Sequence, residues 1–556
     1  MSYFGDVMPL KTASKILKGD LKGAMEEVQL KIERTIGLAG IVIISLSSML
    51  GSGLFVMPAF AAEIMGPGIW LAFLLAATVV LPGALSKSEL ASAMPSSGGS
   101  YVYLERTYGP LFGTISGLGL WASFLLKAAF ALIGFTAYMY AVNTYFDISF
   151  NKTIISICAL FFITVINILG VKKVKAIQTP ILTVTLLMLL VVCIYQLFDP
   201  NTDYARPIDS AFNAEPWKIA ETSAFVFVAY AGVTKVAAIG GEVKDPGRNL
   251  PLGIMISLAI ATFLYCAVTY VMMAALPGEW WLDASGYPRE DPIFAFVDAV
   301  AGTRIGVVAA ILAILTMISM ALAGILAASR FLFAMARDNL LPDAMENVNA
   351  KYETPHWPII FTGGAMLIAI MFLPVKDVAK LASGFKIMIF MLINSCVLIL
   401  RNSKDSQDWY KPEYKSHFYP WIQIWGIIAG GILIYIMGSK AFIGGGTAIL
   451  LGSITYYGYG KKHSEIRTTP FQTFYLQFSN PTKKDRENRL AAFHAADIKG
   501  ENHLTLHEFI SALKALDITY SNDEYRVIFH RLDIDGNGVL DIDEFFEMFE
   551  KATQEE

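Results

Sequence analysis

The sequence is dominated by apolar runs that reach the length of a membrane-spanning helix. A helix rises about 1.5 Å per residue, so about twenty apolar residues cross the hydrocarbon core of a bilayer. Twelve such runs lie at about 37–62, 68–94, 110–142, 153–170, 176–198, 218–240, 251–275, 305–336, 357–374, 377–400, 419–438 and 441–459. We therefore predict an all-α, polytopic membrane protein with twelve spans.

The distribution of charge divides the chain into a membrane body and a soluble tail. Only 16% of the 556 residues are charged and 55% are hydrophobic, which excludes a disordered chain, a coiled coil and a nucleic-acid binder. Residues 481–556 hold nine Lys and Arg against seventeen Asp and Glu, whereas the preceding residues hold 34 against 30. We predict an amphipathic arm at 1–35, a membrane domain at 36–460, a polar linker at 461–483 and a soluble domain at 484–556.

The basic residues of the loops predict the orientation. Loops on the side of the N-terminal arm carry more than twice as many Lys and Arg as the opposite loops. Such an excess marks the cytoplasmic side, so both termini are predicted to be cytoplasmic. The first 35 residues are polar and contain no secretory signal, and we expect the inner (plasma) membrane of a bacterium.

Two spans that lie five spans apart contain glycines where a helix is expected to break. Span 1 has Gly51-Ser52-Gly53 and span 6 has Ala231-Gly232. Glycine costs about 1 kcal/mol against alanine inside a helix, and small residues also serve as close contacts between membrane helices. Matching breaks in two five-helix halves favour an inverted-repeat secondary transporter that holds its substrate where the helices unwind.

The ends of broken helices predict the chemistry of the substrate. Backbone N–H groups at a half-helix N-terminus suit a carboxylate, and carbonyl groups at a half-helix C-terminus suit an ammonium group or Na⁺. Both kinds of end in one site describe an α-amino acid.

Several segments resemble the amino acid–polyamine–organocation superfamily of permeases over about residues 35–460. They are 51–53 (GSG), 89–91 (ELA), 95–103 (PSSGGSYVY), 241–251 (GEVKDPGRNLP), 329–338 (SRFLFAMARD) and 354–356 (TPH). The resemblance implies ten core helices in two inverted halves plus two peripheral helices. It also implies a substrate site at the two breaks.

The resemblance assigns roles to residues on both breaks. The substrate carboxylate would be held by Ser48, Gly51, Ser52 and Gly53. The amino group would be held by Phe227, Val228, Tyr230, Ala231 and Gly232. An aromatic residue near the second break often gates the substrate in relatives, and Phe227 and Tyr230 are both candidates.

Ionisable residues inside the spans bear on ion coupling. Proton-coupled relatives often carry a lysine deep in helix 5, but Thr185 stands near that place here. This argues against proton coupling by that route and favours Na⁺ coupling or exchange without an ion, although H⁺ stays open. Glu89 is expected to form a local pair with Lys87 or an interface contact. Lys235 is either a functional lysine or a partner of Glu63 or Glu242. Lys127 and Lys386 are expected either to snorkel or to line the vestibule, and neither is assigned a role.

The soluble tail carries a pattern typical of a calcium-binding EF-hand. Residues 533–544 place oxygen ligands at the required spacing around a glycine, Gly538. The predicted Ca²⁺ ligands are Asp533, Asp535, Asn537, the carbonyl of Val539, Asp541 and Glu544.

A first, weaker loop begins at Asp497, 36 residues earlier. Lys499 and Asn502 replace an acidic ligand and the turn glycine there, so we expect weak or no calcium binding. Leu504 and Leu540 are expected to form a short β bridge between the loops. The shared core is predicted to contain Phe493, Phe509, Phe529, Phe545 and Phe549.

The sequence thus predicts a transporter of amino acids or related amines with a calcium-binding module. No H-E-x-x-H, phosphate-binding loop or nucleophile elbow is present, so an enzyme is not expected. Two alternatives remain open. One is an amino-acid sensor on a transporter fold, and the other is a carrier of polyamines or organic cations.

Overall fold

The computed structural model describes residues 36–546 with short gaps. The gaps are 95–98, 146–150, 171–173, 234, 239, 241–242, 284, 350–351, 353, 404–409, 465–468, 480, 498–499 and 517–521. The chain forms two compact units, one of residues up to Glu465 and one from Ile466 onward to which Asn402–Gln407 also belong. The predicted arm at 1–35 lies outside the described residues.

Helices cover each of the twelve predicted runs. Their bounds are α3 Leu38–Met49, α4 Ser52–Phe55, α5 Met57–Met65, α6 Ile69–Ala93, α8 Pro110–Tyr145, α9 Lys152–Leu169, α10 Val174–Leu197, α12 Pro216–Val226, η2 Phe227–Gly232, η3 Lys235–Ala238, α13 Pro246–Ala275, α15 Thr303–Arg337, α16 His356–Phe372, α17 Val375–Asn402, α18 Trp421–Met437 and α19 Ser439–Thr455. Among the described residues, seven helical segments are long and apolar enough to cross a membrane, and the sharply bent α18–α19 segment can count as an eighth. The total of twelve spans, which also needs shorter apolar helices such as α9 and α16, stays a prediction.

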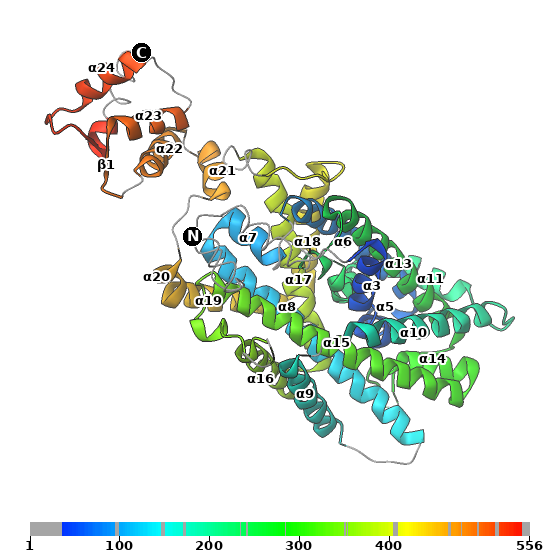
Figure 1. The fold of residues 1–556 in the computed structure, drawn as a ribbon. Coiled ribbons are helices and arrows are strands. Elements are labelled where there is room, and N and C mark those ends of the chain that lie inside the picture. The colour runs from blue at the N-terminus through cyan, green and yellow to red at the C-terminus, as the bar shows by residue number, and fades with distance from the viewer. Residues whose placement is uncertain are drawn as a thin grey trace. The chain divides into compact units, whose positions relative to one another are not determined.

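Helices at matching positions of the two halves pack together. The third span, α8, packs along the eighth, α15; the second, α6, packs against the seventh, α13 (Figure 1). The fourth and ninth spans, α9 and α16, also pack together, and α3 of the first span contacts η2 of the sixth. Each of these pairs is five spans apart, as expected for two halves that repeat the same helix order.

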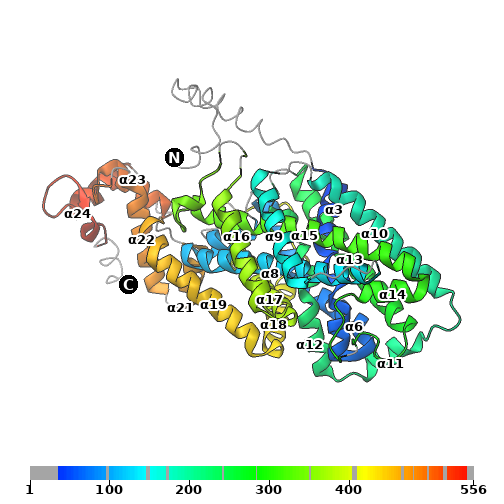
Figure 2. The same ribbon diagram turned by 90° about the horizontal axis from the view of Figure 1, so that it is seen from below.

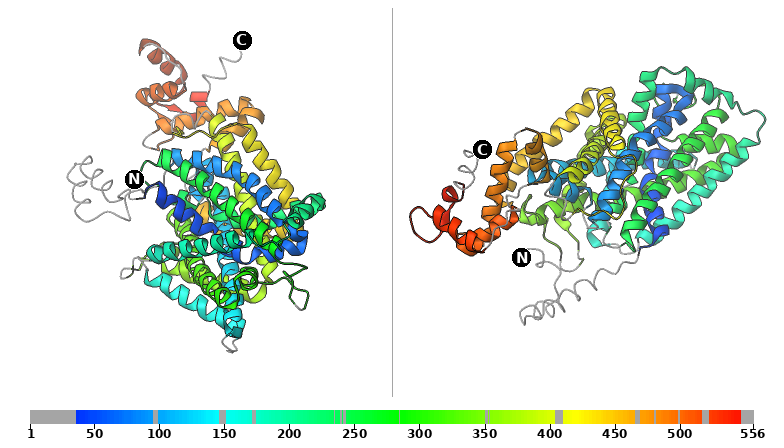
Figure 3. Two further views of the ribbon diagram at one scale, coloured as in Figure 1. Left: turned by 90° about the vertical axis from the view of Figure 1, so that its right-hand side faces the viewer. Right: turned by 90° about the horizontal axis from the view of Figure 1, so that it is seen from above.

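The broken first span is enclosed by the rest of the membrane unit. All four residues of α4 are buried. In Figure 3 the first helices of the chain, coloured blue, lie among the green helices from its middle. Because lipid offers no hydrogen-bond partners, such an enclosed position is where irregular backbone is tolerated in a membrane protein.

Three short helices between the spans were not predicted. They are α7 Ser100–Tyr108, α11 Ala205–Asn213 and α14 Pro292–Ala301. Each is too short to cross a bilayer, so a search for long apolar runs passes over it. The peripheral helix α18 packs against α6 and α12 (Figure 2).

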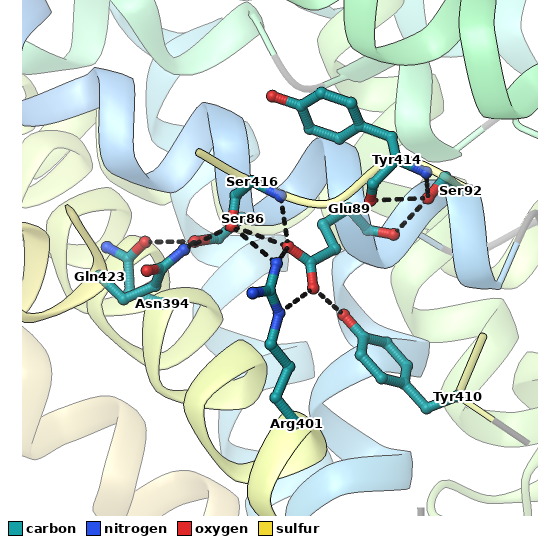
Figure 4. Close-up of polar contacts among 9 residues, drawn as sticks. All are labelled: Ser86, Glu89, Ser92, Asn394, Arg401, Tyr410, Tyr414, Ser416 and Gln423. Carbon is teal, nitrogen blue, oxygen red and sulfur yellow. Dashed lines mark hydrogen bonds and ion pairs between the residues drawn. The ribbon is translucent and has the colours of Figure 1, made fainter. Parts of the chain in front are cut away.

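A buried carboxylate, Glu89, ties the end of α6 to α17. Its oxygens accept hydrogen bonds from Nε and Nη2 of Arg401 at 2.7 and 2.6 Å (Figure 4). The Tyr410 hydroxyl donates to it at 2.9 Å, and Ser416 donates its backbone N–H and its hydroxyl at 2.8 and 2.7 Å. The predicted local pair with Lys87 is therefore wrong, because the partner is Arg401, 312 residues away. The alternative prediction of an interface contact is confirmed.

Further polar groups extend this network to α18. Gln423 donates to the Ser416 hydroxyl at 2.7 Å, and Ser86 donates to Asn394 at 2.8 Å (Figure 4). In the loop before α18, burial and the neighbouring Glu89 carboxylate raise the pKa of Tyr410 far above its usual value. Tyr410 therefore stays a hydrogen-bond donor across the physiological pH range.

The soluble unit is helical with one short sheet. It contains α21 Pro470–Ser479, α22 Pro481–Ala496, β1 His503–Leu504, α23 Leu506–Ala515, α24 Asn522–Leu532 and β2 Leu540–Asp541. Leu504 pairs with Leu540 in an antiparallel register, which confirms the predicted bridge. The predicted core is confirmed for Phe493, Phe509, Phe529 and Phe545, which are all buried, whereas Phe549 lies outside the described residues. The range predicted as a linker differs in that α21 and the start of α22 make much of it helical.

The geometry of the Glu89–Arg401 pair predicts a large effect of removing one partner. Arg401→Met leaves a carboxylate with no exposed surface in the protein interior without its cation, which typically costs about 3–5 kcal/mol. We expect a lower midpoint of thermal unfolding in detergent for this variant. The double variant Glu89→Gln/Arg401→Met, which removes both charges, should recover much of the loss.

The control is Lys440→Met, which removes an exposed lysine from an ion pair with Asp377. Exposed pairs contribute about 1 kcal/mol or less, so its midpoint should stay near that of the wild type. Equal midpoints for Arg401→Met and Lys440→Met would contradict the role given to the buried pair.

Candidate functional site

The two broken spans touch through their glycines. A Cβ atom placed on Gly53 would lie 2.7 Å from Cβ and 2.9 Å from Cα of Ala229 in η2. A Cβ atom on Gly232 would overlap the carbonyl group of Ser48 at the end of α3. Each glycine therefore allows the backbone of the other break to approach closely. The glycines serve both as breaks and as close contacts between helices, the two interpretations that were open from the sequence.

The break in span 6 begins earlier than predicted. The α-helix α12 ends at Val226, and the chain continues as the 3₁₀ helix η2 over Phe227–Gly232. The predicted break lay near Ala231-Gly232, about one turn later. Ser383 of α17 satisfies the backbone where the helix type changes: its hydroxyl accepts from the N–H of Val228 at 3.2 Å and donates to the carbonyl of Phe225 at 2.8 Å.

The carbonyl groups freed at the two breaks are bound by side chains from other spans. Lys127 of α8 donates to the carbonyl oxygen of Ser48 at 2.9 Å and to that of Ala229 at 3.5 Å. Tyr265 of α13 donates to the carbonyl oxygens of Met49 at 2.8 Å and Ala229 at 3.3 Å. Carbonyls predicted to receive an ammonium group or Na⁺ thus already hold a lysine ammonium.

A cavity lies beside this junction. Ser47, Ser48, Phe124, Lys127, Ala128, Gly232, Lys235, Met320, Ala323 and Gly324 line it. Of the nine predicted substrate-binding residues, Ser48 and Gly232 are in this lining. Lys127 and Lys235 are the basic residues in a wall that is otherwise apolar or weakly polar.

Met320 of α15 covers the predicted carboxylate site. A Cβ atom on Gly51 would overlap the Met320 sulfur, and the hydroxyl of Ser52 lies 3.8 Å from that sulfur. Ser52 and Gly53 begin the short helix α4, so their N–H groups have no acceptor within it. Met320 thus packs against Gly51 and Ser52 and also lines the cavity, a position that no signal in the sequence indicates.

The two candidate gating residues are buried away from the cavity lining. Phe227 packs its ring edge-on against Phe390 with centroids 5.6 Å apart. The Tyr230 hydroxyl donates to the carbonyl of Phe73 at 3.0 Å, and its ring packs against Tyr265. Val228 and Ala231 are also buried within η2. These four residues shape the break rather than the cavity wall.

The other intramembrane charges separate into paired and cavity-facing groups. Glu63 pairs with Lys376 at 2.8 Å, so it is not the partner proposed for Lys235, and Glu242 lies outside the described residues. The Lys386 ammonium lies 4.9 Å from the ring centre of Phe124, which lines the cavity. Thr185 donates to the carbonyl of Ile181 within its own helix.

The second loop of the soluble unit converges on one point, as a calcium site requires. Oxygens of Asp533, Asp535 and Glu544 lie within 4.8 Å of one another. Glu544 accepts from the N–H of Ile534 at 2.9 Å and from that of Asp541 at 3.1 Å, so it closes the loop at both ends. Oδ1 of Asp533 is buried with no hydrogen-bond partner. An unsatisfied buried carboxylate oxygen beside two further carboxylates fits a Ca²⁺ ion.

Two further predicted ligands lie in the same loop. The side-chain oxygen of Asn537 accepts from the N–H of Val539 at 2.8 Å. Asp541 accepts from the N–H of Glu544 at 2.8 Å. These contacts hold the loop in a compact form in which the carboxylates already face one another.

The first loop holds its carboxylates through hydrogen bonds and an ion pair within the loop. Asp497 accepts from the N–H groups of Glu501 and Asn502 at 3.1 and 2.7 Å. Burial opposes ionisation of Asp497, but these backbone donors outweigh it and keep the pKa of Asp497 below its usual value. Glu501 pairs with His503, and Glu508 caps α23 through Thr505. Asn502 adopts a left-handed conformation with φ of 56° where the EF-hand pattern has glycine.

The comparison with known families decides the identity of the membrane unit. The model of the amino acid permease family matches residues 36–455. This chain is a member of the amino acid permease family. The model of the EF-hand domain pair matches residues 488–550, so this permease also contains an EF-hand pair.

Relatives of the permease match most of its length. A branched-chain amino acid permease of Bacillus subtilis is 25% identical over 456 residues, which is 78% of this chain and 95% of the relative. A methylthioribose transporter of the same organism is 28% identical over 462 residues, covering 78% and 95%. Its serine/threonine exchanger is 26% identical over 446 residues, covering 78% and 98%.

The close contact at Gly53 predicts that even one methyl group impairs the permease. Gly53→Ala places a Cβ atom 2.9 Å from the backbone of Ala229 and 3.1 Å from the Tyr265 hydroxyl, so the two breaks must separate. We expect uptake to fall by at least tenfold in proteoliposomes, and Gly53→Val to abolish it.

Gly364→Ala is the matched control, because a Cβ atom there meets no atom within 4 Å. It should leave uptake unchanged. Wild-type uptake by Gly53→Val would remove the contact between the breaks from the mechanism.

Proposed function

We propose that this permease carries α-amino acids across the cytoplasmic membrane by alternating access. The observation that carries the proposal is the junction of the two broken spans beside a cavity lined by Ser48 and Gly232. Irregular backbone deep in a membrane protein is tolerated only where it is buried or lines a cavity, and transporters place substrates there. The relatives described as permeases for branched-chain amino acids and as a serine/threonine exchanger support the same substrate class.

In this proposal the substrate carboxylate binds the N–H groups of Gly51, Ser52 and Gly53 after Met320 moves aside. The amino group is held by the η2 segment, which contains Phe227, Val228, Tyr230, Ala231 and Gly232. Rotation of either broken half changes both sets of contacts, because the two breaks pack closely against each other at Gly53 and Gly232. Binding of the substrate at this site is therefore coupled to the movement of the two broken helices.

Several finer features belong to the same proposal. Both termini are cytoplasmic, as the basic loops predict. The membrane domain occupies 36–460 and the calcium-binding domain 484–556. The coupling ion is Na⁺ or H⁺, unless the permease is an exchanger, and the alternatives of a sensor or of a polyamine carrier are separated by experiment.

Uptake by purified protein in proteoliposomes tests the proposal. Each of the twenty amino acids and a polyamine is presented with and without Na⁺ and with and without a pH gradient. Saturable uptake of at least one amino acid is expected. Binding without uptake favours the sensor, and uptake of the polyamine alone favours the organic-cation carrier.

We further propose that Ca²⁺ at the second EF-hand regulates transport. Asp533, Asp535 and Glu544 bring three negative charges together, so Ca²⁺ removes strong repulsion within the loop. Asn537, Asp541 and the carbonyl of Val539 complete the proposed ligand set, while the first loop contributes mainly through the Leu504–Leu540 bridge. A regulatory coupling of this kind typically changes a rate or affinity by about 5- to 150-fold.

The same substitution, glutamate to glutamine at the last position of each EF-hand loop, tests whether Ca²⁺ regulates transport. Glu544→Gln in the second loop should weaken Ca²⁺ binding on the order of 10- to 100-fold, because it removes a charged ligand. It should also remove the response of uptake to Ca²⁺ while leaving uptake in chelator unchanged. Titration calorimetry of the full chain and uptake at fixed substrate measure the two effects.

Glu508→Gln in the first loop is the control and should keep both the main Ca²⁺ site and the response. Flat calcium responses in the wild type and in both variants would exclude regulation of transport. The Ca²⁺ site itself would remain measurable by calorimetry.

A further inference from the structure

Lys127 of α8 lies where the ammonium group of an amino acid is expected. Its Nζ donates to the carbonyl oxygen of Ser48 in the last turn of α3 at 2.9 Å and to that of Ala229 in η2 at 3.5 Å. One ammonium group therefore bridges the two broken spans. The Tyr265 hydroxyl is a second donor to the Ala229 carbonyl, at 3.3 Å, so side chains of the protein itself satisfy both carbonyls.

The carbonyls of the two breaks are the acceptors that hold Lys127 in place. Its side chain is buried, with 6% of its surface exposed, and it lines the cavity at the junction. In the described part of that wall there is no aspartate or glutamate that could pair with it. A buried charge in a membrane interior is costly and is usually retained for function. The position of Lys127 therefore indicates a role at the two breaks during the transport cycle.

Lys127 and the ammonium group of a substrate compete for the same carbonyls. Two ammonium groups within hydrogen-bonding distance of one oxygen repel each other strongly in a low-dielectric site. The lysine side chain has a flexible four-carbon stem, and Lys127 already lines the cavity, so its ammonium can withdraw into that cavity. An amino acid can therefore bind the Ser48 and Ala229 carbonyls through its ammonium group once Lys127 has left them.

We propose that Lys127 is an internal substitute for the substrate ammonium and allows this permease to change conformation without a substrate. This inference rests on the proposed transport function and specifies how the same site is coupled to it. Without a cation at the junction, the Ser48 carbonyl would lose the donor that Lys127 supplies, and a lost hydrogen bond to a buried group is costly in a membrane interior. Lys127 removes this cost once the substrate has been released, and the next substrate ammonium displaces it. The permease therefore returns unloaded and performs net transport instead of obligatory exchange.

The wild-type protein provides the first test. Proteoliposomes loaded with a labelled amino acid are diluted into buffer without amino acid to measure net efflux, or with the unlabelled amino acid to measure exchange. Na⁺ and pH are equal on both sides and the membrane potential is clamped. We expect net efflux within about fivefold of exchange, because losing a buried hydrogen bond would slow the unloaded return by about 5- to 150-fold. A larger excess of exchange overturns this inference but leaves transport intact, whereas absence of both for all twenty amino acids overturns the transport function itself.

Removal of the ammonium group provides the second test. In Lys127→Met the ratio of net efflux to exchange should fall by about 10- to 100-fold, the effect of losing a charged hydrogen bond to a buried carbonyl. Lys386→Met is the matched control, because Lys386 is also buried, with 1% of its surface exposed, but its ammonium lies against the rings of Phe124 and Phe390. The ratio of this control should stay near that of the wild type, and an equal fall in both variants contradicts the inference.

Chemical rescue separates this role of Lys127 from a purely structural one. Lys127→Ala leaves space for a small primary ammonium ion, so propylammonium chloride should restore net efflux in this variant. Tetramethylammonium chloride, whose cation has no N–H donor, should not restore it. If Lys127→Met lowers net efflux and exchange equally and propylammonium restores neither in Lys127→Ala, Lys127 only supports the backbone and the inference is wrong. Should these variants fail to fold, the ratio of net efflux to exchange in the wild type still decides.

Discussion

The membrane unit depends on satisfying backbone groups that two broken helices expose in its interior. Hydrocarbon offers these groups no partner, so the protein must supply every one. Lys127 and Tyr265 bind carbonyls at the junction, and Ser383 binds the backbone where span 6 changes to a 3₁₀ helix. The glycines Gly53 and Gly232 allow the two breaks to come close enough to share these partners. The contacts that satisfy the broken backbone therefore also form the candidate site.

A second long-range interaction joins the helices around this junction. Glu89 of α6 binds Arg401 of α17, and the chain between α17 and α18 folds back to add Tyr410 and Ser416. A carboxylate with this many donors is stable in the interior only while all of them remain in place. The network therefore fixes the relative positions of α6, α17 and the start of α18 at one end of the unit. The pairs formed by Lys376 with Glu63 and Lys380 with Glu221 connect the start of α17 to α5 and α12.

The soluble unit achieves its stability by different means. Its core is a cluster of aromatic rings, with Phe509 packed against both Phe529 and Phe545. The Leu504–Leu540 pair joins the two EF-hand loops through a short antiparallel bridge. The first loop can therefore contribute to the second without holding an ion.

The sequence by itself determined the features that depend on local composition and spacing. Apolar length predicted helices at all twelve runs, and the spacing of oxygen ligands predicted the loop in which Asp533, Asp535 and Glu544 converge. These features are set within one turn, one loop or one helix, so neighbouring residues suffice to define them. Other features were decided only by the tertiary structure: Lys127 on the Ser48 carbonyl, Met320 over Gly51, and Arg401 rather than Lys87 beside Glu89. Lys127 and Ser48 are 79 residues apart in the sequence, and Glu89 and Arg401 are 312 residues apart. Such contacts depend on which face each helix turns to its neighbours. That orientation results from the packing of all the helices together, which no single segment encodes.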